Sequence, residues 1–154
     1  MEQKLSVKEK VGYGLGDFAA NIVFQTVMIF LMYYYTDIFG IPAAAVGTLF
    51  LLSRIWDAVN DPLMGALADR TKSKHGRFRP WIKWTAIPFG LLAVLMFTTP
   101  DFSENGKIVY AYVTYILMMM IYTANNIPYG ALSGVMTSNS IERTSLNSYR
   151  FVLG

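Results

Sequence analysis

The chain has 154 residues, of which 54% are hydrophobic and 15% are charged, and it carries a formal net charge of +3. Soluble domains usually contain about 25% charged residues, so this composition excludes an ordinary soluble protein. The sequence has no cysteine, which excludes disulfide bonds and thiolate metal sites. We therefore expect an all-α membrane protein.

Uncharged runs at 18–36, 84–100 and 108–141 approach or exceed the length of a membrane helix, which is roughly 20 apolar residues. The first helix is expected to end in an aromatic belt at Tyr33–Tyr35. The fourth is expected to be interrupted at Pro128 and Gly130. In chain order, helices are predicted at about 17–35, 43–68, 80–99 and 108–136, with an incomplete fifth from about 145.

Basic residues gather on one side of these helices. Three lysines precede residue 11 and five Lys or Arg residues lie at 69–79, whereas the turn at 36–42 has none. Cytoplasmic loops of membrane proteins are enriched in Lys and Arg. The N-terminus and the 69–79 loop are therefore predicted to be cytoplasmic. Basic residues at a membrane edge do not indicate a nucleic-acid partner.

The sequence stops about ten residues into the predicted fifth helix, which is about half of a membrane span. We therefore expect residues 1–154 to be the N-terminal part of a longer transporter. The alternatives are a small four-helix membrane protein with a polar tail and a truncated product without transport activity.

The most distinctive stretch is Arg54–Pro62, which places charges inside an apolar segment. Asp57 and Asp61 are four residues apart and share a helix face, with Arg54 three residues before Asp57. Each charge facing lipid would cost roughly 2.5–3.5 kcal/mol. This face is therefore expected to line a protein interior or a watery cavity.

The charged face offers oxygen ligands to a cation. Hard cations such as Na⁺ prefer carboxylate, amide and hydroxyl oxygens, and two close carboxylates also favour binding a proton, because they repel one another when both are ionised. The alternative is that Arg54 simply neutralises Asp57 or Asp61 and holds helices together. The predicted cation ligands are Asp57, Asn60, Asp61 and Thr123, with Asp57 and Asp61 as the carboxylates.

Amide and aromatic side chains mark a second candidate site. Asp17 and Asn21 lie near the start of the first helix, and Asn125 and Asn126 lie in the fourth. Together with tyrosine hydroxyls at 34, 122 and 129, such groups at mid-membrane depth suit a sugar. The alternative is ordinary hydrogen bonding between helices.

Asp69 and Arg70 open the basic loop and are predicted to form a charged latch at the cytoplasmic face, and Arg54 is predicted to have a gating or structural role. The alternative for the loop is that its basic residues only set the orientation of the protein in the membrane. Enzyme chemistry has little support, because the sequence has no Cys/His pair, no G-x-S-x-G motif and no phosphate loop. We expect no enzyme activity and no cofactor beyond a coupling cation, Na⁺ or H⁺.

Three motifs carry a family resemblance, at Leu31–Asp37, Arg54–Pro62 and Gly76–Trp81, and Tyr115–Pro128 extends it. The chain resembles the glycoside-pentoside-hexuronide:cation symporters of the major facilitator superfamily. The resemblance implies a twelve-helix transporter, of which this chain matches the first four helices and the start of the fifth. It also implies a multi-pass protein of the bacterial inner membrane that moves a sugar with a cation by alternating access.

The resemblance carries over residue by residue. All four cation ligands of the family are retained. Two carboxylates that bind galactoside hydroxyls in the family correspond to Asn21 and Asn126, a lysine corresponds to Ala20, and a stacking tryptophan corresponds to Gly130. The predicted substrate-binding residues are therefore Asp17, Asn21, Tyr34, Asn126 and Arg150.

These replacements argue against a galactoside. An anionic uronide could pair with Arg150, whereas a neutral pentoside could use the amides of Asn21 and Asn126. Both remain open on the sequence. The rival is a carrier of a non-sugar solute or a lipid on the same fold.

Overall fold

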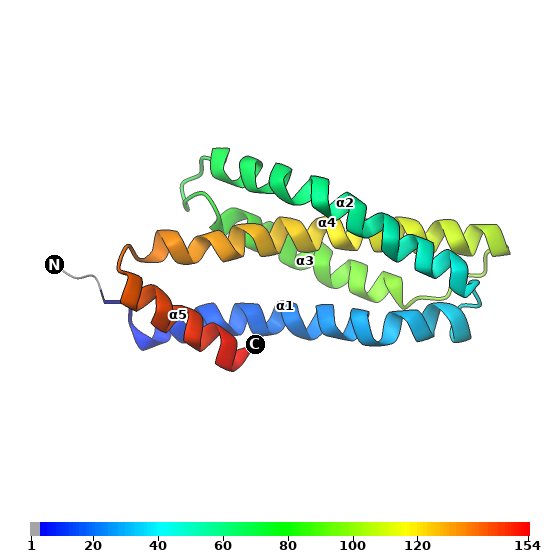
Figure 1. Cartoon of the computed structure of the whole chain (residues 1–154), viewed down its shortest axis with the longest axis horizontal. Helices are drawn as coiled ribbons and strands as arrows, with labels where there is room; N and C mark the ends of the chain where they lie inside the picture. The colour runs from blue at the N-terminus through cyan, green and yellow to red at the C-terminus, as the bar shows by residue number, and fades with distance from the viewer. Residues whose placement is uncertain (1–3) are drawn as a thin grey trace.

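The computed structural model describes residues 4–154, and these residues form helices joined by short loops (Figure 1). The described part of the chain contains no strand, so the all-α prediction is confirmed. The elements are α1 (Val7–Tyr33), the π-helical turn η1 (Tyr34–Ile38), α2 (Ala43–Arg70), α3 (Arg79–Met96), α4 (Glu104–Met136) and α5 (Ser140–Leu153).

Several helices begin at earlier residues than predicted, because hydrogen-bonding caps precede them. α1 begins about ten residues early because Ser6 and Glu9 form a capping box. Ser103 caps α4, and the Asn139 side chain accepts from two backbone N–H groups at the start of α5. An apolar run marks the part of a helix that can be buried, whereas a cap fixes where the helix begins.

The predicted interruption of the fourth helix is wrong. α4 continues through Pro128 to Met136, just as α2 contains Pro62 and α3 contains Pro88. A proline removes one backbone hydrogen bond, and neighbouring helices can compensate for that loss.

The predicted aromatic belt is wrong for two of its three tyrosines. Tyr33 is 59% exposed, but Tyr34 and Tyr35 are only 7% and 1% exposed. Both belong to η1, where Tyr34 packs edge-on against Phe97 with ring centroids 5.1 Å apart. The apolar core extends from here along α1, α3 and α4.

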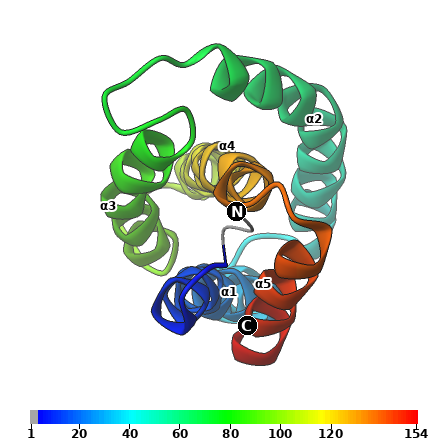
Figure 2. The same cartoon turned by 90° about the vertical axis from the view of Figure 1, so that its left-hand side faces the viewer.

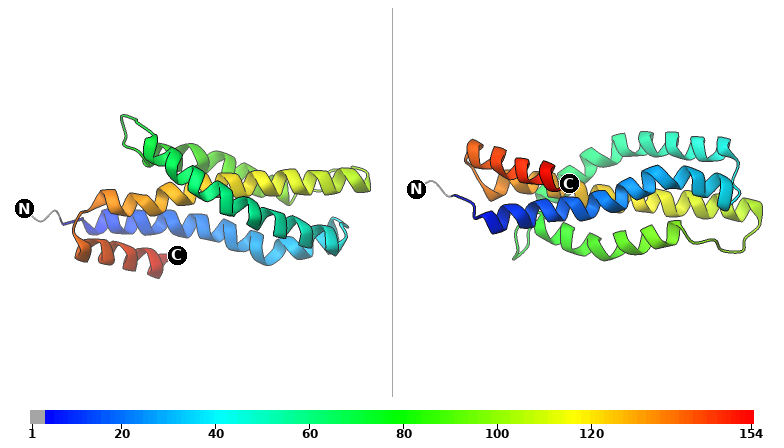
Figure 3. Two further views of the ribbon diagram at one scale, coloured as in Figure 1. Left: turned by 45° about the horizontal axis from the view of Figure 1, so that its top comes forward. Right: turned by 90° about the horizontal axis from the view of Figure 1, so that it is seen from below.

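α4 lies in the middle of the bundle, with α1, α2 and α3 around it (Figure 2). α5 lies along the first half of α1 (Figure 3). α1 and α5 begin at the same end of the bundle and run parallel, and α2 and α4 form a second parallel pair that begins at the opposite end (Figure 1). The candidate site residues are distributed over these two pairs.

By length and composition, two helices within residues 4–154 are able to cross a membrane, namely Val7–Ile38 and Glu104–Met136. The sequence predicted four complete spans. α2 has 28 residues, which is long enough, but the charges in its middle lower its mean hydropathy. Its membrane placement therefore depends on what those charges face.

Gly14 permits the close approach of α1 and α5. A Cβ atom at this position would lie 2.7 Å from Leu153 Cδ1 and 2.9 Å from the Tyr149 carbonyl oxygen. A side-chain methyl group can move aside, but a helix carbonyl is fixed by its own hydrogen bonding. This contact sets the distance at which polar side chains meet across the two helices.

We predict that Gly14→Ala destabilises the full-length protein in detergent, since overpacking typically costs about 1–3 kcal/mol. Thermal unfolding should give a lower Tm. Gly12→Ala is the matched control, because a Cβ atom there meets nothing within 4 Å, and it should keep or raise the Tm through better helix propensity. Equal Tm values for the two variants would contradict the assigned packing.

Candidate functional site

The predicted cation ligands lie where α2 meets α4. Thr123 Oγ1 donates a hydrogen bond of 3.2 Å to Asp61 Oδ1. Asn60 is 9% exposed and Asp57 is partly buried on the same helix. The structure therefore brings Asp61 and Thr123 into contact across two helices, and it places Asn60 and Asp57 within one turn of Asp61.

Two polar atoms in this group have no partner within residues 4–154. Asp57 Oδ1 and Asn60 Nδ2 are buried and make no hydrogen bond. Arg54 is exposed and forms no ion pair with a carboxylate in the described chain. The structure therefore does not show the alternative, in which Arg54 neutralises Asp57 or Asp61 through a direct ion pair. Unsatisfied buried polar atoms are costly and point to an additional binding partner.

The donor set suits a hard cation or a proton. Two carboxylates, one hydroxyl and one amide are present, and a half-turn of the Asn60 amide would offer its oxygen in place of its nitrogen. Among residues 4–154, no group of three or more His, Cys, Asp or Glu side chains is placed to hold a metal ion. The atoms that this group could offer are carboxylate, hydroxyl and amide oxygens, which hard cations such as Na⁺ prefer.

A second polar group joins α1, α4 and α5. Arg150 Nη2 lies 2.9 Å from Asp17 Oδ1, and Asn21 Nδ2 donates to Asp17 Oδ2 at 3.1 Å. The Arg150 guanidinium also lies over the Tyr129 ring, 5.5 Å from its centroid. The structure thus brings together three of the five predicted substrate-binding residues, Asp17, Asn21 and Arg150.

Two tyrosines support this group. The Tyr13 and Tyr129 rings stack with centroids 4.6 Å apart, and each hydroxyl donates to the other residue's backbone carbonyl. From the sequence, Tyr129 was predicted only to supply a hydroxyl group, and Tyr13 was not predicted to support a site. The spacing could have indicated Tyr13, because it lies four residues before Asp17 on the same helix face.

Asn126 borders the same region from α4. Its Nδ2 donates to the Tyr122 hydroxyl at 3.1 Å, and the Tyr122 ring stacks on Phe24 of α1 with centroids 4.4 Å apart. Asn125, the neighbouring amide, instead donates to Thr85 of α3 at 2.7 Å. The two asparagines therefore have different partners, and Asn125 holds α3 and α4 together.

Three other predicted residues lie apart from this group. Tyr34 is about 25 Å further along the first helix than Asp17, at 1.5 Å per residue, and its buried hydroxyl has no partner in the described chain. Asp69 and Arg70 are exposed at the end of α2. A latch role for Asp69 and Arg70 and a sugar role for Tyr34 stay predictions.

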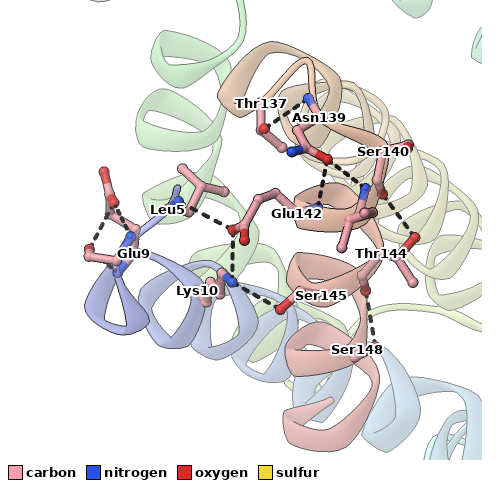
Figure 4. A network of polar contacts seen from close by, with 12 residues as sticks. Leu5, Glu9, Lys10, Thr137, Asn139, Ser140, Glu142, Thr144, Ser145 and Ser148 are labelled. Atoms are coloured by element: carbon pink, nitrogen blue, oxygen red, sulfur yellow. Dashed lines mark hydrogen bonds and ion pairs between the residues drawn. The ribbon is translucent and has the colours of Figure 1, made fainter. Parts of the chain in front are cut away.

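An ion pair that the sequence did not indicate ties the start of α1 to the start of α5 (Figure 4). Lys10 Nζ lies 2.9 Å from Glu142 Oε2 and donates to Ser145 Oγ at 2.9 Å. The Leu5 backbone N–H donates to the same carboxylate oxygen at 3.3 Å. No local pattern could reveal this network, because Lys10 and Ser145 are 135 positions apart.

Comparison with known proteins gives a consistent result. Residues 12–154 match the family described as MFS/sugar transport protein. The chain is 58% identical to the inner membrane symporter YicJ of Escherichia coli, over 97% of this chain and 32% of that protein. It is 47% identical to the isoprimeverose transporter of Lactiplantibacillus pentosus, over 95% and 30%.

A glucuronide carrier protein homolog of Escherichia coli is 41% identical, over 97% of this chain and 33% of that protein. The chain therefore spans about a third of the length of these relatives. The similarity to symporters confirms the resemblance that the motifs indicated.

The Lys10–Glu142 contact gives a prediction about pH. The hydrogen bond from Lys10 lowers the pKa of Glu142 below its ordinary value of 4.5. A carboxylate with a lowered folded-state pKa stabilises the protein above its unfolded-state pKa and loses that contribution as the pH falls through the folded-state value. Glu142→Gln should therefore lower the Tm at pH 7, and the difference from wild type should close below about pH 4.

Thermal unfolding across this pH range tests the assignment, with Glu104→Gln as the control. Glu104 is exposed in the first turn of α4, and its substitution should not give the same pH-dependent difference. A difference for Glu142→Gln that is constant down to pH 3.5 would contradict the ion pair.

Proposed function

Because this chain belongs to the MFS/sugar transport protein family, we propose that the full-length protein is a cation-coupled sugar symporter that works by alternating access. The substrate is a glycoside, pentoside or hexuronide, and the coupling cation is Na⁺ or H⁺. The protein is a transporter and not an enzyme. The relatives named as symporters and as a sugar transporter support this proposal.

The observation that carries the proposal is the oxygen group between α2 and α4. Asp61 accepts a hydrogen bond from Thr123. Asp57 Oδ1 and Asn60 Nδ2 are buried without hydrogen-bond partners in the described chain. A cation or proton bound here would compensate two carboxylates that otherwise repel one another. Ion binding would thereby strengthen the contact between α2 and α4.

Coupling to the sugar follows from the position of α4. Thr123, Asn126 and Tyr129 recur every three residues, so they lie within about 9 Å along one helix, at 1.5 Å per residue. Thr123 donates a hydrogen bond to Asp61 of the proposed cation site. Tyr129 contacts Arg150 of the proposed sugar site. An ion that fixes α4 also positions the proposed sugar site. The cation and the sugar then each raise the affinity of the protein for the other by the same factor.

We place the protein in the bacterial inner membrane, with its N-terminus and the loop between α2 and α3 in the cytoplasm. The five Lys or Arg residues at 69–79 support this orientation. Short turns at the opposite end of the bundle, with fewer basic residues, would then face outward.

A carrier of a non-sugar solute or a lipid is the alternative, because one fold serves many substrates. Uptake of labelled pentosides, uronides and lysolipids by the full-length protein separates these possibilities. Accumulation of a lysolipid in place of a sugar would favour the alternative.

Asp57→Asn and Asp61→Asn in the full-length protein are each predicted to reduce cation stimulation of sugar uptake by at least about tenfold, since even indirect supports of an ion ligand typically contribute that much. Sugar binding without the cation should persist. Uptake into proteoliposomes with and without a Na⁺ or H⁺ gradient measures the effect.

Asp101→Asn serves as the control for the loss of one negative charge, because Asp101 is exposed in the loop before α4. This variant should keep wild-type stimulation. If both α2 variants also keep wild-type cation dependence, the proposed ion site is wrong.

A further inference from the structure

We propose that Asp17 is the internal counter-ion of Arg150, and that this pair makes the sugar site selective for neutral glycosides over anionic ones. The inference rests on the proposed function and names the substrate class of the same site. It addresses the choice between a neutral pentoside and an anionic uronide, which the sequence leaves open.

The pair is close and poorly hydrated. Arg150 Nη2 lies 2.9 Å from Asp17 Oδ1, and the two side chains are 25% and 9% exposed. Charges that are partly withdrawn from water interact more strongly and are screened less by salt than surface charges. The positive charge of Arg150 is therefore already compensated before any ligand binds.

Asp17 is held firmly in this position. Arg150 occupies one of its carboxylate oxygens, and the Asn21 amide donates to the other at 3.1 Å. Gly154 leaves room beside the same carboxylate, since a Cβ atom there would lie 2.8 Å from Asp17 Oδ2. A substrate carboxylate would have to displace Asp17 from Arg150 or add a second negative charge next to it.

A second ion pair joins α1 and α5 within residues 4–154. Lys10 of α1 is buried, and its ammonium group is paired with Glu142 and donates a hydrogen bond to Ser145. In both ion pairs recorded between α1 and α5 in the described chain, one basic and one acidic side chain therefore compensate each other.

Arg150 also keeps a buried donor without a partner in the described chain. Arg150 Nε is buried and has no hydrogen-bond partner within residues 4–154. A sugar hydroxyl can accept from it without bringing charge. The Tyr129 ring beneath the guanidinium adds an apolar surface. A neutral ring with hydroxyl groups can accept from Arg150 Nε and pack on the Tyr129 ring. A carboxylate can also accept from Arg150, but it competes with Asp17 for the guanidinium.

Competition binding to the full-length protein tests this selectivity. The matched ligands are a 4-nitrophenyl xyloside and the corresponding 4-nitrophenyl glucuronide, which differ by the carboxylate at C5. The wild type should bind the xyloside at least about tenfold more tightly. The methyl ester of the glucuronide is larger than the acid by one methyl group but lacks its charge, so it should also bind at least about tenfold more tightly than the acid.

The protein variant tests the role of Asp17 directly. Asp17→Asn leaves Arg150 without its counter-ion, and the preference should shift toward the glucuronide by at least about tenfold. Glu142→Gln is the matched control, because it removes the acid of the other α1–α5 ion pair. This control should leave the ratio of the two affinities unchanged.

The outcomes separate the two proposals. Equal affinities for the acid and its methyl ester would overturn the selectivity inference even if Asp17→Asn did not fold, as would a wild-type preference for the glucuronide. An unchanged ratio in folded Asp17→Asn would overturn it as well. In each of these cases the protein still binds a sugar, so the proposed function stands, whereas binding of no sugar at all would overturn both.

Discussion

The need to compensate every buried charge governs this bundle. The interface between α1 and α5 meets that need internally, with Lys10 paired to Glu142 and Asp17 paired to Arg150. The interface between α2 and α4 does not, because it holds Asp57 and Asp61 without a paired cation in the described chain. The two ion pairs of the first interface are thus neutral and the second interface is acidic, so the proposed cation would favour the second.

The central position of α4 connects the two interfaces. Its Thr123 contacts α2, and about two turns later its Tyr129 contacts Tyr13 of α1 and Arg150 of α5. Long polar-bearing helices in a membrane protein are stable only when their polar groups meet each other across helix contacts. The same contacts that stabilise the bundle therefore also link a candidate ion site to a candidate sugar site.

Glycine and tyrosine packing fix the geometry of the polar group around Asp17 and Arg150. Gly14 lets α5 approach α1 closely enough for Asp17 to reach Arg150. The Tyr13–Tyr129 stack then holds α4 against α1 on the other side. An ion pair is directional and short-ranged, so its strength depends on this backbone spacing. The packing therefore sets the backbone spacing on which the proposed selectivity depends.

The sequence alone determined the helical class and the acidic face of α2, because hydropathy and the spacing of Asp57 and Asp61 are local properties. It misplaced the start of α1, where a cap decides, and the course of α4 through Pro128, where neighbouring helices decide. Only the tertiary structure decided that Arg150 is paired with Asp17, since such a contact depends on how α5 docks on α1 and leaves no trace in local sequence.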